Sequence, residues 1–357
     1  SLYHQIAFLL VLLSLFSVES KSSIDDECRD VNKIPTVTLS NGVEMPLLAL
    51  GTAHLITHEG MLPENPSFTG MIPERLHRSL TLAFEAGMRA IDTALIYRTH
   101  HQIRQVLGNW FASGRLVRSD VFLETKIYHG PVDGGIPTAE THLPNLDKMT
   151  PEQVTTQVIA QFEQSLVELG VGYVDLMLLH WPATMGSKDA MNRERRIAAW
   201  DVLQDFYAKG WARAIGVSNF SVEHLEQLIK DGVTIQPMVN QIEASIYLQF
   251  SDIVEYCKER DIVVQAYSPL GRGLKDINKD PVVVEIANKH NRNVGQIAMR
   301  YLIQRGYAIA FLSSSEERLV SNQEIFSFEL DEQDMKQLTE LSRPDGSWGL
   351  PPPHDMT

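Results

Sequence analysis

The chain has 357 residues, of which 44% are hydrophobic, and its formal net charge is -14. The acidic balance disfavours broad attraction to nucleic acid or anionic lipid, and the hydrophobic fraction is ordinary for a soluble protein. The two cysteines, Cys28 and Cys257, have no paired spacing, so we expect neither a metal site nor a disulfide framework. The length suits one (β/α)8 barrel of roughly 250 residues with insertions.

The N-terminal segment differs from the rest of the chain. Residues 6–16 form a charge-free apolar run, short for a bilayer span and followed by small polar residues. This pattern is typical of a secretory signal peptide, which we place at 1–23 and follow with an acidic linker over 24–34. We therefore expect the secretory pathway or the extracellular space, with no stable membrane span after cleavage. A retained signal anchor, targeting to an organelle, or a buried N-terminal helix are the alternatives.

From residue 35 onward, strand-like and helix-like segments alternate. An Asn-Gly turn at 41–42 predicts a β-hairpin first. Apolar runs typical of buried strands follow at 47–51, 88–92, 120–125, 174–180, 212–218, 237–243, 262–268 and 308–314. Helices are predicted between them over 72–86, 100–112, 151–169, 193–208, 222–229 and 253–260. Such alternation requires a parallel sheet with crossover helices, and eight strands favour closure. The predicted fold class is α/β, with a single (β/α)8 TIM barrel over 35–342 and a tail over 343–357.

Two segments rich in proline and glycine, 54–70 and 127–149, follow predicted strands and have no assigned element. Loops that follow barrel strands lie at the C-terminal face, where sites are built. We expect these insertions to form a lid or a substrate wall; inert surface insertions are the alternative. The tail contains Trp348, which either closes the same pocket or belongs to a loose proline-rich end.

Three of the strand-like runs end in residues that handle protons. These residues are Asp92, Lys126 and His180, and Tyr97 follows the first of them closely. At the C-terminal ends of neighbouring barrel strands, the four side chains would meet over one substrate atom. A positive charge beside a phenol stabilises phenolate, and a carboxylate can hold that ammonium. Each residue alone is as well explained by packing or a structural ion pair, but the set suits proton transfer to an oxygen.

Six stretches of the sequence resemble motifs of the aldo-keto reductase family. They are GMRAIDTALIY, the lysine of FLETK, LGVGYVDLMLLHWP, AIGVSNFS, MVNQIE and AYSPLGRG, in that order. The resemblance implies a (β/α)8 barrel that reduces aldehydes or ketones with NADPH and uses neither metal nor flavin. It also implies that Tyr97 donates the proton, that Lys126 paired with Asp92 lowers the pKa of that tyrosine, and that His180 orients the carbonyl. Trp181 matches an aromatic residue of the substrate pocket.

The resemblance covers the cofactor site as well, with the nicotinamide against the ring of Tyr267. Positions that match the family pattern for cofactor binding are Gly51, Thr52, Asp92, Ser218, Asn219, Gln241, Tyr267, Ser268, Leu270, Ser313, Arg318 and Asn322. The family's usual lysine at the adenosine end is replaced by Leu312, so we expect NADPH with weaker discrimination against NADH. Ala53 stands where a tryptophan is common, which predicts a wider pocket floor, and a short segment after Gly273 predicts fast cofactor exchange.

We expect a monomeric reductase acting on a small-molecule carbonyl, with substrate contacts from Tyr97, His180 and Trp181. A catalytically weak, nucleotide-binding regulatory member of the same fold is the alternative, and a metal-dependent barrel hydrolase lacks a convincing ligand set. The intact set of Asp92, Tyr97, Lys126 and His180 favours catalysis. The glycosylation sequon at Asn219 lies inside the nicotinamide motif, so on a secretory route it must stay unmodified.

Overall fold

Eight parallel strands form a closed barrel in the computed structural model, which describes residues 34–55, 68–70, 73–127, 146–183, 189–271 and 277–343. The strands are β3 (Leu48–Gly51), β6 (Ala90–Asp92), β7 (Phe122–Ile127), β8 (Val174–Leu179), β9 (Ala212–Ser218), β10 (Val239–Glu243), β11 (Val263–Tyr267) and β12 (Ala308–Phe311). The first and last strands close the barrel, with Ile309 registered to Leu48. The predicted barrel is confirmed, because each of the eight strand-like runs overlaps one of these strands, and only β7 extends beyond its run, by two residues.

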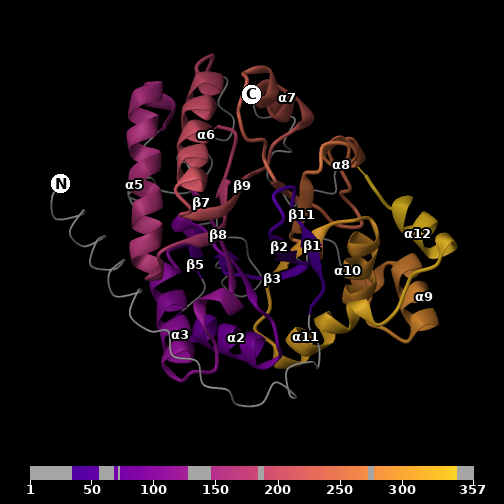
Figure 1. The fold of residues 1–357 in the computed structure, drawn as a ribbon. Coiled ribbons are helices and arrows are strands. Elements are labelled where there is room, and N and C mark those ends of the chain that lie inside the picture. Colours follow the sequence, from indigo (N-terminus) through magenta and orange to yellow (C-terminus); the bar gives the residue numbers. More distant parts are fainter. Residues whose placement is uncertain are drawn as a thin grey trace.

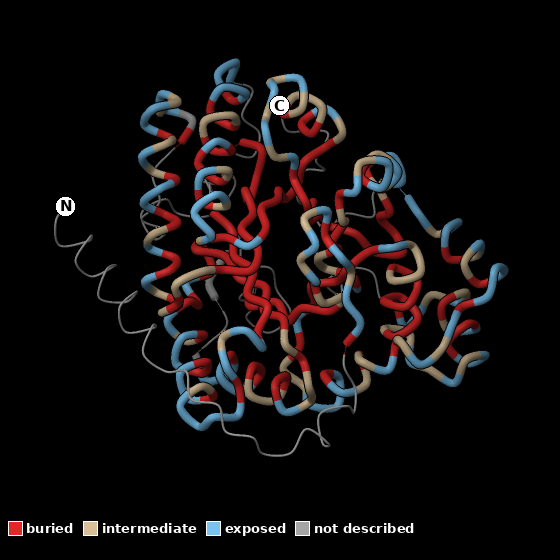
Figure 2. Tube along the Cα trace, in the orientation of Figure 1, coloured by how far each residue is buried: buried red, intermediate tan, exposed pale blue. Residues whose placement is uncertain are grey.

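Helices surround the barrel on its outer side (Figure 1). They are α2 (Pro73–Glu85), α3 (His100–Ala112), α5 (Pro151–Leu169), α6 (Asn192–Ala208), α7 (Val222–Lys230), α8 (Ser251–Lys258), α9 (Pro281–His290), α10 (Val294–Gln304), α11 (Glu316–Ser321) and α12 (Glu332–Thr339). The six predicted helices are all present, with small shifts at their ends. The buried strands lie inside, and exposure is concentrated on the outer turns of the helices (Figure 2).

The sequence analysis assigned no helix between β11 and β12, where the structure has α9 and α10. Both begin with caps that the sequence carries. The Asp280 side chain accepts hydrogen bonds from the backbone N–H groups of Val282 and Val283, and the Asn293 side chain accepts one from Gln296. An Asp-Pro pair and an Asn three residues before a Gln are ordinary helix-start signals, so these two helices were predictable.

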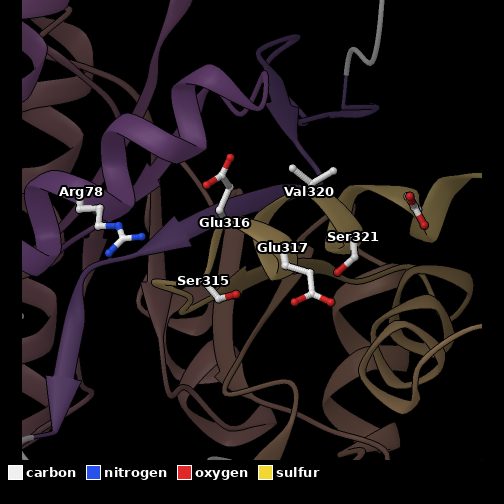
Figure 3. A pocket seen from close by; sticks show the side chains of 7 residues that line it. Arg78, Ser315, Glu316, Glu317, Val320 and Ser321 are labelled. Carbon is white, nitrogen blue, oxygen red and sulfur yellow. The ribbon is translucent and has the colours of Figure 1, made fainter.

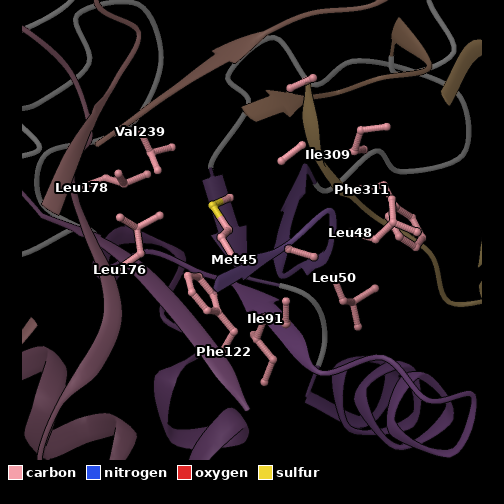
Figure 4. Packing of buried hydrophobic residues seen from close by; sticks show 14 of the residues in the cluster. Met45, Leu48, Leu50, Ile91, Phe122, Leu176, Leu178, Val239, Ile309 and Phe311 are labelled. Atoms are coloured by element: carbon pink, nitrogen blue, oxygen red, sulfur yellow. The ribbon is translucent and has the colours of Figure 1, made fainter. Parts of the chain in front are cut away.

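The predicted N-terminal hairpin is present as β1 (Thr36–Thr38) and β2 (Glu44–Pro46), paired antiparallel. Gly42 in the turn has a φ of 85°, a left-handed backbone that glycine adopts without a steric penalty. The side chain of Met45 is 1% exposed and projects among the apolar side chains that fill the barrel, including Phe122 and Leu176 (Figure 4). The hairpin therefore contributes to the barrel core.

The first insertion is described only at its two ends. These ends form a second antiparallel pair, β4 (Ala53–Leu55) with β5 (Phe68–Gly70), and β5 lies beside the 3-10 helix η2 (Leu95–Tyr97). The remaining predictions for that insertion lie outside the described residues. The same is true of the signal peptide, most of the linker, residues 128–145, the segment over 272–276 and the tail with Trp348. Within the described ranges, we found no helix with the length and apolarity needed to cross a membrane.

Candidate active site

Consecutive barrel strands bring three of the predicted catalytic residues to the C-terminal rim. Asp92 ends β6, Lys126 lies near the end of β7, and His180 directly follows β8. Tyr97 ends η2, the short 3-10 helix that follows β6, and the next residue, Arg98, has a left-handed φ of 56° that stops this helix. All four are largely buried. Neighbouring strands thus gather residues that are far apart in the sequence, as the sequence analysis expected.

Lys126 is at the centre of this group. Its Nζ forms an ion pair with Asp92 Oδ1, donates to the Thr93 carbonyl at 3.0 Å, and lies 5.2 Å from the centroid of the Tyr97 ring. Burial lowers the pKa of Lys126, but attraction to Asp92 and to the phenolate form of Tyr97 outweighs burial, so the net shift of the pKa is upward. The lysine is therefore a permanent ammonium at neutral pH.

Aromatic rings form the wall above this ion pair. The rings of Tyr97 and His180 meet edge to face, with centroids 5.7 Å apart and planes at 79°, and the ring of Trp181 stacks beside His180 at 6.1 Å. Ala53 packs against the small apolar cluster that contains Tyr97. A tyrosine hydroxyl and an imidazole at one rim can both hydrogen-bond one substrate oxygen.

The four residues expected at the nicotinamide form one hydrogen-bonded chain. The Tyr267 hydroxyl donates to Asn219 Oδ1 at 2.8 Å, and Asn219 Nδ2 donates to Ser218 Oγ at 3.1 Å. Ser218 Oγ donates to the backbone carbonyl of Gln241 at 2.8 Å, and Asn219 Nδ2 also donates to the backbone carbonyl of His180 at 3.0 Å. The Tyr267 ring is thus fixed by its hydroxyl, and the Asn219 amide beside it is oriented.

The first and seventh barrel strands end in further predicted cofactor residues. A Cβ at Gly51 would lie 3.4 Å from the Phe311 carbonyl oxygen, and the Thr52 hydroxyl donates to the Asp92 carbonyl at 3.0 Å. After β11, Ser268 has a left-handed φ of 55° and its carbonyl accepts from the N–H of Gly271 at 2.9 Å. This tight turn leaves Leu270 exposed at the same rim.

The sequence analysis missed a buried polar layer directly beneath Lys126. The Gln241 Nε2 lies 3.1 Å from Asp92 Oδ1, 3.2 Å from Glu124 Oε1 and 2.7 Å from Gln265 Oε1. Glu124 and Gln265 are fully buried. The signal was available, because each stands two residues before a predicted site residue, Lys126 or Tyr267, and side chains at that spacing on a strand share a face.

The residues predicted for the adenosine end lie in the loop after β12, in α11 and directly after it. Ser313 and Asn322 are buried, whereas Leu312 is 45% exposed and Arg318 is exposed. An open pocket adjoins them between α2 and α11 (Figure 3). It is lined by Arg78, Ser315, Glu316, Glu317, Val320, Ser321 and Glu324. This lining holds more carboxylates than cations, with three glutamates and one arginine.

An arginine from another element reaches this end of the site. Arg75 of α2 donates to Ser314 Oγ from Nε at 3.0 Å and from Nη2 at 2.8 Å. Ser314 lies in the loop that also carries Leu312 and Ser313. The sequence analysis did not find Arg75, because an exposed arginine on a surface helix has no local signal for ligand binding.

The described residues contain one buried cysteine outside the candidate site. Cys257 is buried and forms no disulfide within the described residues, and burial raises the pKa of its thiol to about 12. Among the residues that the structure describes, no three His, Cys, Asp or Glu side chains are grouped so as to hold a metal ion. The chemistry of the described site is thus that of a phenol, an ammonium, an imidazole and a carboxylate.

A family model described as aldo/keto reductase family matches residues 47–343, and the chain belongs to this family. It is therefore an oxidoreductase that acts on carbonyl or alcohol groups with a nicotinamide cofactor. The chain is 34% identical over 308 residues to glyoxal reductase of Bacillus subtilis, covering 86% of this chain and 93% of that protein. It is 30% identical to the aldo-keto reductase AKR2E4 of Bombyx mori, covering 87% and 92% of the two chains.

The solved structures show the same fold. The crystal structure of Bombyx mori AKR2E4 in complex with NADP superposes with a TM-score of 0.72 at 29% identity, covering 87% of this chain and 93% of that chain. A second silkworm enzyme, AKR2E5 complexed with NADPH, gives a TM-score of 0.71 at 29% identity, covering 88% and 89% of the two chains. Both neighbours are described with the phosphorylated form of the cofactor.

Proposed function

We propose that the protein reduces a small-molecule aldehyde or ketone to an alcohol with NADPH, and that Tyr97 donates the proton. Three side-chain contacts carry this proposal. The Lys126 ammonium lies beside the Tyr97 ring, the Asp92 carboxylate forms an ion pair with that ammonium, and the His180 ring packs against the same tyrosine. This arrangement favours transfer of a proton from a phenol to an oxygen that gains negative charge.

The residues present fit a nicotinamide cofactor. The Tyr267 ring is partly exposed, and its hydroxyl is fixed by Asn219, so that its face is available to a flat ring. Ser218, Asn219 and Gln241 would hold the carboxamide, and the loop residues Ser268 and Leu270 would lie along the pyrophosphate. When bound, NADPH supplies the hydride that is added to the carbonyl carbon.

The protein residues then account for the proton. His180 and Tyr97 would hydrogen-bond the carbonyl oxygen and orient the substrate. As the carbon accepts the hydride, the oxygen takes the proton from the Tyr97 hydroxyl, and the C=O group becomes CH–OH. The phenolate left at Tyr97 is stabilised by the Lys126 ammonium until a proton from solvent restores it. Trp181 and Ala53 would form part of an apolar wall that limits access of water.

We propose NADPH as the preferred cofactor, with weaker discrimination against NADH than a lysine at position 312 would give. The NADP-bound and NADPH-bound structural neighbours support the first part. The exposed Leu312 and the carboxylates of the adjoining pocket support the second, because a carboxylate can bind a ribose 2′-hydroxyl but repels a 2′-phosphate.

A carbonyl panel followed by NADPH absorbance tests the activity, using protein that lacks residues 1–23. In Tyr97→Phe the general acid is absent, so we expect kcat to fall by about 10²- to 10⁴-fold with little change in NADPH affinity. Tyr256→Phe, a change on the outer helix α8, is the matched control and should keep the parent rate. Equal rates for Tyr97→Phe and the parent would favour the catalytically weak, regulatory alternative.

We also propose that the protein is a monomer of the secretory pathway, as the apolar run at 6–16 suggests. In the folded protein the sequon asparagine is inaccessible to a glycosyltransferase. Asn219 is 3% exposed, and its amide donates to the Ser218 hydroxyl and the His180 carbonyl. We expect Asn219 to carry no glycan. Mass spectrometry of the native protein would give both the mature N-terminus and any glycan, and an intact residue 1 would contradict signal cleavage.

A further inference from the structure

Four polar side chains form a layer across the inside of the barrel, beneath the candidate active site. Asp92 of β6 is registered to Glu124 of β7, and Gln241 of β10 is registered to Gln265 of β11. Registered residues of adjacent parallel strands point to the same side, so two carboxyl groups lie next to each other, as do two amides. Barrel interiors are usually filled by apolar layers, so a polar layer calls for an explanation.

Glu124 and Gln265 are the two residues of this layer without an assigned role, and of these two only Glu124 is ionisable. Glu124 is 0% exposed, and both of its oxygens receive amide hydrogens: Oε1 from Gln241 at 3.2 Å and Oε2 from Gln265 at 3.1 Å. The Gln241 Nε2 lies at 3.1 Å from Asp92 Oδ1 as well, so the carboxyl groups of Glu124 and Asp92, at registered positions, lie beside the same nitrogen. Two neighbouring carboxyl groups inside a barrel cannot both be ionised at low cost, because like charges repel strongly where water is excluded.

The surrounding charges decide which carboxyl carries the proton. Asp92 is paired with the Lys126 ammonium and receives the Gln241 N–H as well, which favours its ionised form. Glu124 accepts hydrogen bonds from the neutral amides of Gln241 and Gln265. On its other side, the residue registered to it on β8 is the uncharged Leu176. The charged groups that act on Glu124 are thus Asp92 on β6 and Lys126 on its own strand. Burial, followed by the negative charge of Asp92, raises the pKa of Glu124 well above its ordinary range.

We propose that Glu124 is a positioning residue that works as a neutral carboxylic acid, donating its hydrogen to Asp92 and bracing the amides of Gln241 and Gln265. The layer then holds one negative charge, on Asp92, opposite the one positive charge of Lys126. A second carboxylate would leave a net negative charge inside the barrel, where it would strengthen the hold on Lys126 and oppose formation of phenolate at Tyr97.

Glu124 would affect cofactor binding by orienting the Gln241 amide. This step rests on the proposed function, in which Gln241 holds the nicotinamide carboxamide. Because the Gln241 Nε2 is turned toward Asp92, Glu124 and Gln265, the same amide offers its Oε1 as the acceptor for a carboxamide N–H. Glu124 is then part of the support that fixes the orientation of the Gln241 amide.

The sign of the pH dependence follows from the raised pKa. The unfolded chain loses the Glu124 proton near pH ~4.3, whereas the folded protein keeps it to higher pH. The contribution of this proton to the free energy of unfolding is therefore complete below pH ~4.3 and is lost as the pH rises from there through the folded-state pKa of Glu124. Relative to Glu124→Gln, which has no proton to lose, the unfolding equilibrium constant of the parent should rise by up to about tenfold per pH unit over that interval.

Infrared spectroscopy without cofactor or substrate tests the protonation state directly. We expect the parent at pH 7 to show the C=O band of a protonated carboxylic acid and Glu124→Gln to lack it, so the difference spectrum of the two proteins should contain that band. If Glu124→Gln does not fold, a carboxyl ¹³C titration of the parent labelled at glutamate gives the same information. A Glu124 carboxyl that is ionised at pH 7 in either experiment overturns the proposal, whether or not the protein reduces carbonyls.

Kinetics with three variants test the positioning role. Glu124→Ala should raise the Kd for NADPH more than it lowers kcat, and Glu124→Gln should restore most of the affinity, because its amide can donate to Asp92. Leu123→Ala is the matched control: Leu123 is fully buried in the same strand but points away from the layer, so its truncation should lower the Tm without raising the Kd. Equal increases in Kd for Glu124→Ala and Leu123→Ala would overturn the proposal.

Discussion

The nicotinamide end and the adenosine end of the candidate cofactor site differ in how their residues are held. At the nicotinamide end, the strand-borne residues Ser218 and Gln241 are buried and join one hydrogen-bond network with Asn219 and Tyr267. At the adenosine end, Leu312 and Arg318 lie on exposed loop and helix positions beside an acidic pocket. The barrel therefore constrains one end strongly, and the other end has Leu312 at the position where the resemblance implies a lysine.

Removal of the central ammonium should give the largest effect. In Lys126→Met, the buried carboxylate of Asp92 loses its partner, and breaking a buried ion pair from one side destabilises a protein by about 3–5 kcal/mol. Urea unfolding measures this change, and kcat should fall with it because Tyr97 loses its neighbouring charge. Retention of the parent stability would mean that the nicotinamide end is no more constrained than the other end.

Introduction of the missing charge at the adenosine end should have the next largest effect. Leu312→Lys adds a charge-assisted contact to the 2′-phosphate, worth roughly 1.5–3 kcal/mol. We expect the ratio of catalytic efficiencies for NADPH and NADH to rise by about tenfold or more. An unchanged ratio, from a parent that already prefers NADPH strongly, would show that another residue supplies the charge.

A single hydrogen bond in the nicotinamide network should matter less. Tyr267→Phe keeps the ring but removes the hydroxyl that Asn219 accepts, and a neutral hydrogen bond of this kind contributes about 0.5–1.5 kcal/mol. We expect a few-fold increase in the Kd for NADPH and a similar one for NADH, since both share the nicotinamide. Quenching of tryptophan fluorescence measures both, and a loss restricted to NADPH would contradict the placement of this tyrosine.

The smallest effect is expected for the arginine that was found only in the structure. Arg75→Met removes the contacts to Ser314 and the positive charge of the side chain. An exposed charge pair between this arginine and a 2′-phosphate would contribute about 0.2–1 kcal/mol. If Arg75 partly replaces the missing lysine, the Kd for NADPH should rise up to about fivefold while that for NADH stays constant, and the difference should shrink at high salt. An equal change for both cofactors would limit Arg75 to holding the loop.

Most barrel strands and several helix ends were predictable because they depend on short-range sequence patterns. The strands containing Asp92, Lys126 and Gln241 are apolar runs of the right length, and helix α5 begins at a Thr-Pro cap and ends before Gly170. The inward direction of Glu124 and Gln265 could have been predicted from their spacing to Lys126 and Tyr267, but the hydrogen bond between them could not, since it forms only when strands far apart in sequence close the barrel. Arg75 was missed for the same reason, because its partner Ser314 is distant in the chain.

Barrel closure also sets the moment at which a newly made chain becomes active. Strand β12 pairs with β3 across most of the polypeptide, through Ile309 and Leu48, so the last strand must leave the ribosome before the first gains its second neighbour. Until then the barrel that encloses the layer beneath Lys126 is open between β3 and β11. Turnover during synthesis or refolding would consequently report the final step of assembly, later than the gain of helical signal from the outer ring.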